Sequence, residues 1–153
     1  MSAPVPSPKN RYQEKFGAPA AGAATKVVDH LNDYVCEFIR HAPFAVMATA
    51  DGDGHCDASP KGGYPGFVKV LDSRHLLLPD VRGNRLFQSY DNVDRNAHVG
   101  LIFFIPGIDW TARVNGTAQV VDEKDLEARG ICLEVFDPDD NAALQQGLLI
   151  EVL

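Results

Sequence analysis

Short apolar segments separated by turn residues constrain the fold of this chain more than any other feature. Six of them have the composition of β-strands: "FAVMATA", "HCDAS", "FVKVL", "HLLLP", "VGLIFFI" and "TARVNGTAQVV". The Asp-Gly pairs of "DGDG", after the first segment, tolerate the positive φ of a tight hairpin. So many strands in 153 residues exceed what one flat sheet would hold, and the pattern therefore predicts an antiparallel β-barrel in a single domain.

Three helices are predicted around these strands. Apolar residues recur at helical spacing in "VVDHLNDYVCEFI", which predicts an amphipathic helix with Thr25 as its N-cap and Pro43 as its stop. Shorter helices are predicted in "GNRLFQSYDNV" and "EKDLEARGI". The expected fold class is therefore mainly β with flanking helices.

Residues 1–24 differ in composition from the rest of the chain. They are rich in Ala, Pro, Gly and Ser and contain the basic stretch "KNRYQEK". This composition predicts a flexible N-terminal arm that drapes over a partner subunit. Residues 25–153 are then expected to form the single domain.

Charge and composition exclude several classes of function. The net charge of −7 argues against nucleic acid or an anionic membrane as the main partner, and no apolar run approaches the roughly 20 residues that span a bilayer. The three cysteines show no CxxC spacing and no secretory segment precedes them, which favours the cytoplasm. The five histidines are scattered, so no metal site is expected. Between Lys61 and Arg113, however, seven basic residues stand against five acidic ones, which permits a local anion site.

Three segments combine glycine with groups that bind phosphate. They are "SPKGG" at 59–63, "PDVRGNR" at 79–85 and "TARVNG" at 111–116. Glycine lets the backbone approach a ligand, and "GNRLF" is also predicted to open a helix whose free N–H groups would bind an anion beside Asn84 and Arg85. Arg85 would hold a phosphate in a bidentate manner and Lys61 would act as a point charge. Each segment alone has a simpler interpretation as a turn, a helix start or a strand end, but together they predict a phosphate-bearing ligand.

The stretch "DASPKGGYPGF" is predicted to begin as a paired strand and then to loosen after Ser59. Pro60 gives up a ladder donor, and Gly62 and Gly63 remove side chains where a ligand could approach. Aromatic residues that could stack on a ligand ring are Tyr64 and Trp110, although such residues at barrel ends commonly serve packing.

These motifs, in this order, resemble the FMN-binding split-barrel family related to pyridoxamine 5'-phosphate oxidase, in particular a branch marked by "SPKG" and "GNR". The resemblance covers about Pro43 to Val121 and the preceding helix. It implies a split antiparallel β-barrel and a homodimer with FMN at the subunit interface. Carried over by position, the implied FMN contacts are Ser59, Pro60, Lys61, Gly62, Leu78, Pro79, Asp80, Asn84, Arg85 and, from the partner chain, Thr111 and Arg113.

The resemblance implies an FMN-dependent oxidoreductase of unknown substrate, with an electron donor such as NAD(P)H. No nucleophile and base pair is recognisable, since Ser59 has no placed partner and His55 is not positioned as a base, so catalytic residues stay unassigned. Relatives of the oxidase proper carry basic residues where Ser59 and Asn84 stand, and they continue past "GLLIEVL" into a segment that binds pyridoxal phosphate. This difference disfavours genuine vitamin B6 oxidation, and it is also compatible with a truncated chain.

Two alternatives from other functional classes stay open at this point. The same barrel can serve as a binding module for haem, a deazaflavin or flavin without turnover. Haem would need an axial His, Cys, Met or Tyr facing a pocket. The barrel can also be an interaction domain that has lost its ligand.

Overall fold

Seven antiparallel strands form one continuous sheet in the computed structural model, which describes residues 9–24, 26–80, 86–131 and 146–153. The strands lie in the order β2-β1-β5-β6-β7-β4-β3. Their bounds are β1 Phe44–Ala50, β2 Cys56–Gly62, β3 Lys69–Val70, β4 His75–Pro79, β5 His98–Phe104, β6 Thr111–Asp122 and β7 Gln146–Val152. The predicted antiparallel, mainly β architecture is confirmed.

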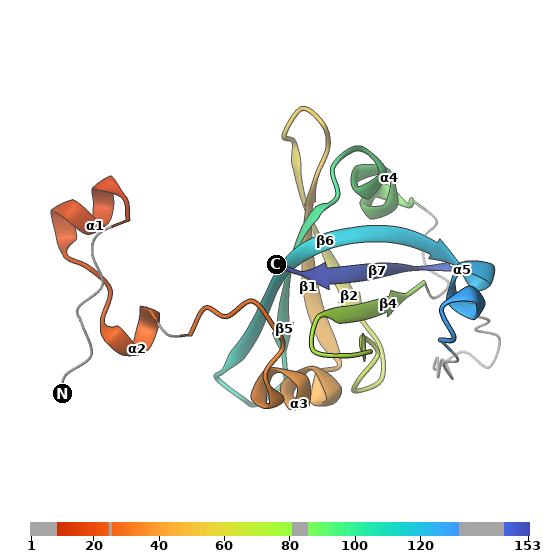
Figure 1. Ribbon diagram of the computed structural model, residues 1–153, viewed down its shortest axis with the longest axis horizontal. Coiled ribbons are helices and arrows are strands. Elements are labelled where there is room, and N and C mark those ends of the chain that lie inside the picture. Colours follow the sequence, from red (N-terminus) through yellow and green to blue (C-terminus); the bar gives the residue numbers. More distant parts are fainter. Residues whose placement is uncertain (1–8, 25, 81–85, 132–145) are drawn as a thin grey trace.

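The long strand β6 joins the two halves of this sheet. Its first part pairs with β5 and its second part with β7, and both pairings overlap at Gly116 and Thr117. Figure 1 shows that β6 curves strongly, so that β7 and β4 run across the direction of β1, β2 and β5. A Cβ atom at Gly116 would overlap the carbonyl oxygen of Glu151, so only glycine fits where β6 changes partners. The two halves enclose the main hydrophobic core between them.

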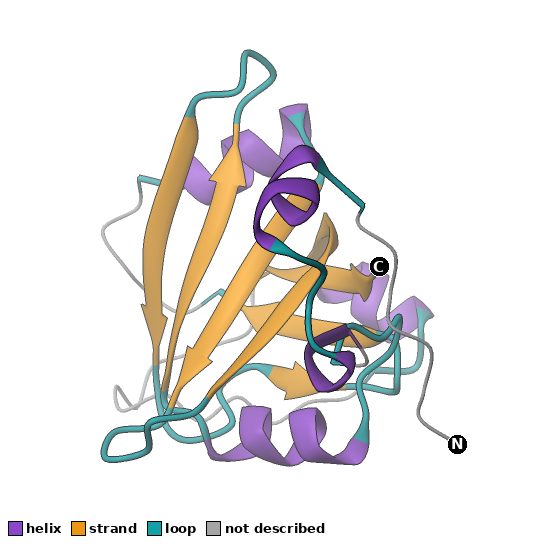
Figure 2. Cartoon of the chain, turned by 90° about the vertical axis from the view of Figure 1, so that its left-hand side faces the viewer, coloured by secondary structure: helices purple, strands orange, loops and turns teal. Residues whose placement is uncertain are grey.

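The described ranges contain five helices, three of which pack against the sheet (Figure 2). They are α1 Arg11–Phe16, α2 Ala21–Ala24, α3 Asp33–His41, α4 Gln88–Arg95 and α5 Glu123–Ala128. Helix α3 packs against β3 and β6, α4 against β1 and β6, and α5 against β6. The buried side of α5 completes a second, smaller apolar cluster with β4, β6 and β7 through Leu126. No helix in the described ranges is long and apolar enough to cross a membrane.

Three predictions about element boundaries need correction. Helix α3 begins after Asn32, whose side chain accepts a hydrogen bond from the Val35 backbone N–H at 2.9 Å, and not after Thr25. Val27 and Val28, assigned to the apolar stripe of this helix, are exposed and precede it. Of "FVKVL" only two residues form a strand, β3.

The strand β7 was not predicted, although it is central to the second half of the sheet. Its residues alternate only weakly between apolar and polar, because four consecutive positions from Gly147 to Ile150 are buried. It pairs with β6 on one side and β4 on the other. The predicted N-terminal arm contains the two short helices α1 and α2, which Figure 1 shows projecting away from the barrel.

Candidate functional site

The "SPKG" segment forms the last part of β2, at one edge of the described sheet. β2 pairs with β1 along its whole length. The prediction that it loosens after Ser59 is therefore wrong, because pairing continues to Gly62. Pro60 is tolerated since the outer side of an edge strand has no ladder of hydrogen bonds to complete.

Alternate side chains of β2 face the inside of the barrel. Directly opposite residues of an antiparallel pair lie on the same face of the sheet. The three buried side chains of β1 stand opposite three polar residues of β2: Ala45 opposite Lys61, Met47 opposite Ser59, and Thr49 opposite Asp57. A polar stripe therefore follows the inner face of an otherwise apolar barrel along its edge strand.

The cation of this stripe meets the start of helix α4. Lys61 is half-buried, and its Nζ donates to the hydroxyl of Ser89, 3.4 Å away. Ser89 is itself buried in the first turn of α4. Burial lowers the pKa of Lys61 from its ordinary 10.5, and the nearby Asp57 and Asp80 carboxylates oppose this shift. Among the described residues no carboxylate forms an ion pair with Lys61.

Asp80 closes the other side of the same region. It follows β4, and it is held by Gln146, which donates from its side chain to Asp80 Oδ2 at 2.9 Å and accepts from the Asp80 backbone N–H. Burial, and next the charge of Asp80, raise the pKa of the half-buried Tyr90 phenol in the first turn of α4. The Lys61–Ser89 hydrogen bond joins β2 to α4, and the charge of Asp80, directly after β4, favours the protonated forms of both Lys61 and Tyr90 and so raises the pKa of each.

The start of α4 differs from the prediction. The helix begins at Gln88, with Phe87 as N-cap, and not at "GNR". No side chain caps this end, and Phe87 adopts φ of 51°, a left-handed conformation that is rare for a bulky residue. The Phe87 ring packs edge-on against Tyr90. Asn84 and Arg85 lie outside the described residues, in the segment that joins Asp80 to this helix.

The glycines that follow Lys61 have different structural roles. A Cβ at Gly63 would come within 2.8 Å of the Phe67 Cβ. Gly66 has φ of 80°, and its Cβ would lie 2.9 Å from the Arg40 carbonyl oxygen. At Gly62 the nearest atom to an added Cβ is the Pro43 carbonyl oxygen at 3.4 Å, which is an ordinary contact. The fold therefore requires glycine at 63 and 66, whereas at 62 it leaves room for a side chain.

This contrast gives a matched pair of variants. We expect Gly63→Ala to lower the free energy of unfolding by about 1–3 kcal/mol because it overpacks the turn. Gly62→Ala is expected to leave that free energy within about 0.5 kcal/mol of wild type, because Gly62 stands opposite the exposed Phe44 on the outer face of the sheet and has room for a methyl group. Chemical denaturation measures both effects. Equal destabilisation by the two substitutions would show that the fold does not distinguish the two glycines.

The remaining predicted contacts are divided between two faces of the sheet. Leu78 belongs to the buried core and Pro79 is buried beside it. Thr111 and Arg113 are exposed on β6, on the face opposite to Lys61, because Arg113 stands opposite the outward-facing Ile102. Three strand spacings, about 14 Å in total, separate β6 from β2. The structure thus brings Ser59, Lys61 and Asp80 together within one chain but keeps Thr111 and Arg113 apart from them.

The family follows from the sequence match that covers this whole region. Residues 31–142 match the family model of pyridoxamine 5'-phosphate oxidase. The chain belongs to the pyridoxamine 5'-phosphate oxidase family. No curated protein matches the sequence.

Solved structures show the same split-barrel fold. A candidate pyridoxamine 5'-phosphate oxidase from Lactobacillus delbrueckii is 22% identical with a TM-score of 0.60, and the alignment covers 82% of this chain and 93% of that one. HupZ of Group A Streptococcus is 17% identical with a TM-score of 0.58, and the alignment covers 80% of this chain and 90% of that one. An F420 reductase is 15% identical with a TM-score of 0.50, and the alignment covers 76% of this chain and 91% of that one. At these identities the likeness establishes the fold and leaves the reaction open.

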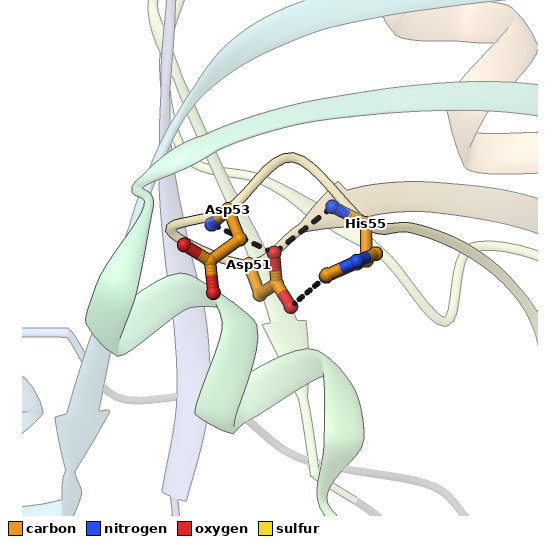
Figure 3. Close-up of side chains that lie close together, drawn as sticks. All are labelled: Asp51, Asp53 and His55. Atoms are coloured by element: carbon orange, nitrogen blue, oxygen red, sulfur yellow. Dashed lines mark hydrogen bonds and ion pairs between the residues drawn. The ribbon is translucent and has the colours of Figure 1, made fainter.

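In this member of the pyridoxamine 5'-phosphate oxidase family, His55 lies at the tip of the β1–β2 hairpin. Figure 3 shows it with Asp51 and Asp53. Each of the three side chains has an atom that could bind a metal ion, and these atoms lie within 4.8 Å of one another. Asp51 Oδ1 accepts from the backbone N–H groups of Asp53 and His55, and Oδ2 from His55 Nδ1 at 2.8 Å. These hydrogen bonds, that of the His55 side chain first, lower the pKa of Asp51. These hydrogen bonds give the cluster a structural role, which is to stabilise the turn between β1 and β2.

Exposed aromatic residues and a groove are further features of the surface. Trp110 is exposed and contacts Tyr34 of α3, and Tyr64 is exposed after β2. A shallow groove of about 350 Å³ lies over β4, β7 and β6. Its lining includes His75, Glu151 and Arg129 but none of the predicted cofactor contacts.

Three residues of the site were not found from the sequence. Asp57, Ser59 and Lys61 occupy alternate positions of "DASPK". Because alternate residues of a strand face the same side, Asp57 could have been predicted to lie beside Lys61. Ser89 and Tyr90 gave none, since they meet Lys61 and Asp80 only because α4 docks on β1.

Proposed function

We propose that this protein binds FMN, with the phosphate between Lys61 and the start of α4, and acts as an FMN-dependent oxidoreductase. One observation carries the proposal. A half-buried lysine points at the uncapped N-terminus of a helix, where the helix dipole is positive. Two positive features side by side are unfavourable unless an anion lies between them, and a helix N-terminus is an established phosphate site. The Asp57 and Asp80 carboxylates offset the charge of Lys61 without pairing with it.

The residues present fit FMN. The phosphate would be held by Lys61, by the hydroxyls of Ser59 and Ser89, by backbone N–H groups of the first turn of α4, and by Asn84 and Arg85. Pro79 and Asp80 would border the ring. When bound, FMN supplies hydride chemistry, and the protein positions the ring and controls access to it. The substrate and the electron donor, for which NAD(P)H is our candidate, are not defined by these residues.

The outer face of the sheet supports a homodimer. Across β2, β1 and β5 this face carries small and apolar side chains, with Ala48 opposite Ala58, Val46 opposite Pro60 and Ile102, and Phe44 in ring contact with Phe104 at 6.0 Å. Such an exposed apolar face is typical of an interaction surface. Thr111 and Arg113 lie on its border, so a second copy would bring them to the FMN of the first. Cys36 and Cys56 are both free thiols, which suits the cytoplasm that we propose as the compartment.

The absorption spectrum of the isolated protein tests this function. We expect a yellow protein that releases FMN on denaturation, identified by mass, and whose flavin is bleached by NAD(P)H under anaerobic conditions. A colourless protein that takes up no added FMN contradicts the proposal. A haem spectrum would favour the binding-module alternative, and bound flavin that no donor reduces would indicate a carrier.

A further inference from the structure

The N-terminal arm presents an exposed aromatic face on its first helix. In α1, Tyr12 and Phe16 are four positions apart and therefore lie on one side of the helix. Their side chains are 59% and 76% exposed. Arg11 lies over the Tyr12 ring at 4.7 Å and Lys15 over the Phe16 ring at 5.2 Å, which leaves the other face of each ring open.

Helix α1 is well defined at both ends despite its six residues. The Asn10 side chain accepts from the backbone N–H groups of Tyr12 and Gln13, each at 3.0 Å, and Gly17 ends the helix with φ of 98°. A helix this short is marginal in water without packing. None of its residues is buried, and Figure 1 shows it projecting away from the barrel. Packing of the exposed aromatic face on another surface would supply the stabilisation that such a short helix lacks.

The barrel carries a surface of matching chemistry, which we call the Tyr34–Trp110 patch. The Tyr34 ring of α3 and the Trp110 ring before β6 lie 6.3 Å apart, and they are 50% and 67% exposed. An exposed carboxylate precedes each ring in the chain, Asp33 before Tyr34 and Asp109 before Trp110. An aromatic pair flanked by two carboxylates is therefore complementary to an aromatic pair flanked by two cations.

We propose that α1 of one copy docks on the Tyr34–Trp110 patch of a second copy of this chain, so that the two arms are exchanged. Charge complementarity supports a second copy as the occupant, since residues 1–24 hold three basic residues and one acidic residue in a protein of net charge −7. The patch is also linked to the proposed dimer face through the chain, because the β5–β6 loop leads from Phe104 of that face to Trp110. The inference rests on the homodimer proposed above but not on its cofactor.

Photocrosslinking in the full-length protein tests arm exchange. Phe16 is replaced by p-benzoylphenylalanine, and light and heavy isotope-labelled copies are unfolded together and refolded. Native mass spectrometry first confirms that light–heavy dimers form. We expect crosslinked peptides that join a light arm to a heavy segment containing Tyr34 or Trp110, at about ten times the yield from the same probe at the exposed Leu153. Crosslinks within one isotope only, crosslinks to another surface, or a yield equal to that at Leu153 would each overturn arm exchange.

A charge swap provides a second test that does not depend on the aromatic residues. Asp109→Lys should lower the light–heavy crosslink yield several-fold, and Asp109→Lys combined with Lys15→Glu should restore it. Failure of the double variant to recover contradicts the proposed pairing. If light–heavy dimers form but no exchange is seen, arm exchange fails and the dimer stands. If no dimer forms, both fail, while FMN binding is judged separately by the spectrum.

Discussion

Lys61→Met is expected to weaken FMN binding by about 10- to 100-fold, because it removes a charge-assisted contact to the phosphate. Riboflavin, which lacks the phosphate, should lose less than about threefold. Methionine has a similar length and preserves the apolar stem that packs at the barrel edge. The expected result is therefore a loss of discrimination between the two flavins, which isolates the phosphate from the ring.

Fluorescence titrations of the apoprotein with FMN and with riboflavin measure this difference. Lys124→Met, at an exposed position of α5, is the matched control and should bind both flavins as wild type does. Equal weakening of FMN and riboflavin by Lys61→Met would place Lys61 beside the ring or in a purely structural role. Unchanged binding of both would remove it from the site.

The same substitution should leave the apoprotein as stable as wild type or more stable by up to about 1 kcal/mol, because a partly desolvated cation beside a helix N-terminus is unfavourable. The sign of the pH dependence follows from the lowered pKa of Lys61. Between its folded pKa and the unfolded value near 10.5, the unfolded chain holds the proton more often than the folded chain, so the wild-type apoprotein gains stability as pH rises through this window. Lys61→Met should lack that gain, which chemical denaturation across the alkaline range measures.

The sequence predicted the strands that turn residues delimit, and it failed where tertiary packing or a side-chain cap sets the boundary. "FAVMATA" became β1 with the predicted bounds because one face is buried and the hairpin turn follows directly. Strands β4 and β7 are both buried on consecutive residues, a pattern that does not distinguish a strand from a buried helix. The turn residues "DS" identify the start of β4, whereas "AALQ" precedes β7 without a turn signal. The helical period of Val27 and Val28 continued upstream of α3, but the Asn32 side chain supplies the cap and fixes the start.

At the candidate site, the sequence located the motif but not its geometry. "SPKG" marked Lys61 because lysine and glycine together are typical of anion contacts. Which partner Lys61 would meet depended on how α4 docks, and local sequence does not encode a contact across 28 positions. The separate roles of Gly62 and Gly63 likewise depend on the position of Phe67, which only the folded turn determines.

The docking of α4 itself depends on a buried polar pair. Asn92 on α4 donates from Nδ2 to the Thr49 hydroxyl on β1 at 2.9 Å, and both side chains are buried. Asn92→Leu leaves the Thr49 hydroxyl without this donor inside the barrel, so we expect the free energy of unfolding to fall by about 2–3 kcal/mol. Asp94→Ala on the exposed side of the same helix should change it by less than about 0.5 kcal/mol.

Replacing both partners distinguishes the hydrogen bond from simple packing. Thr49→Val combined with Asn92→Leu removes the unpaired hydroxyl, so the double variant should be more stable than Asn92→Leu alone, with a coupling of about 1–2 kcal/mol in a double-mutant cycle. Because Ser89 and the helix N-terminus face Lys61 only when α4 is docked, Asn92→Leu should also weaken FMN binding, and the double variant should recover part of it. Additive effects on stability would show that Thr49 and Asn92 act independently. Full FMN affinity in a destabilised Asn92→Leu protein would show that α4 does not form the phosphate end of the site.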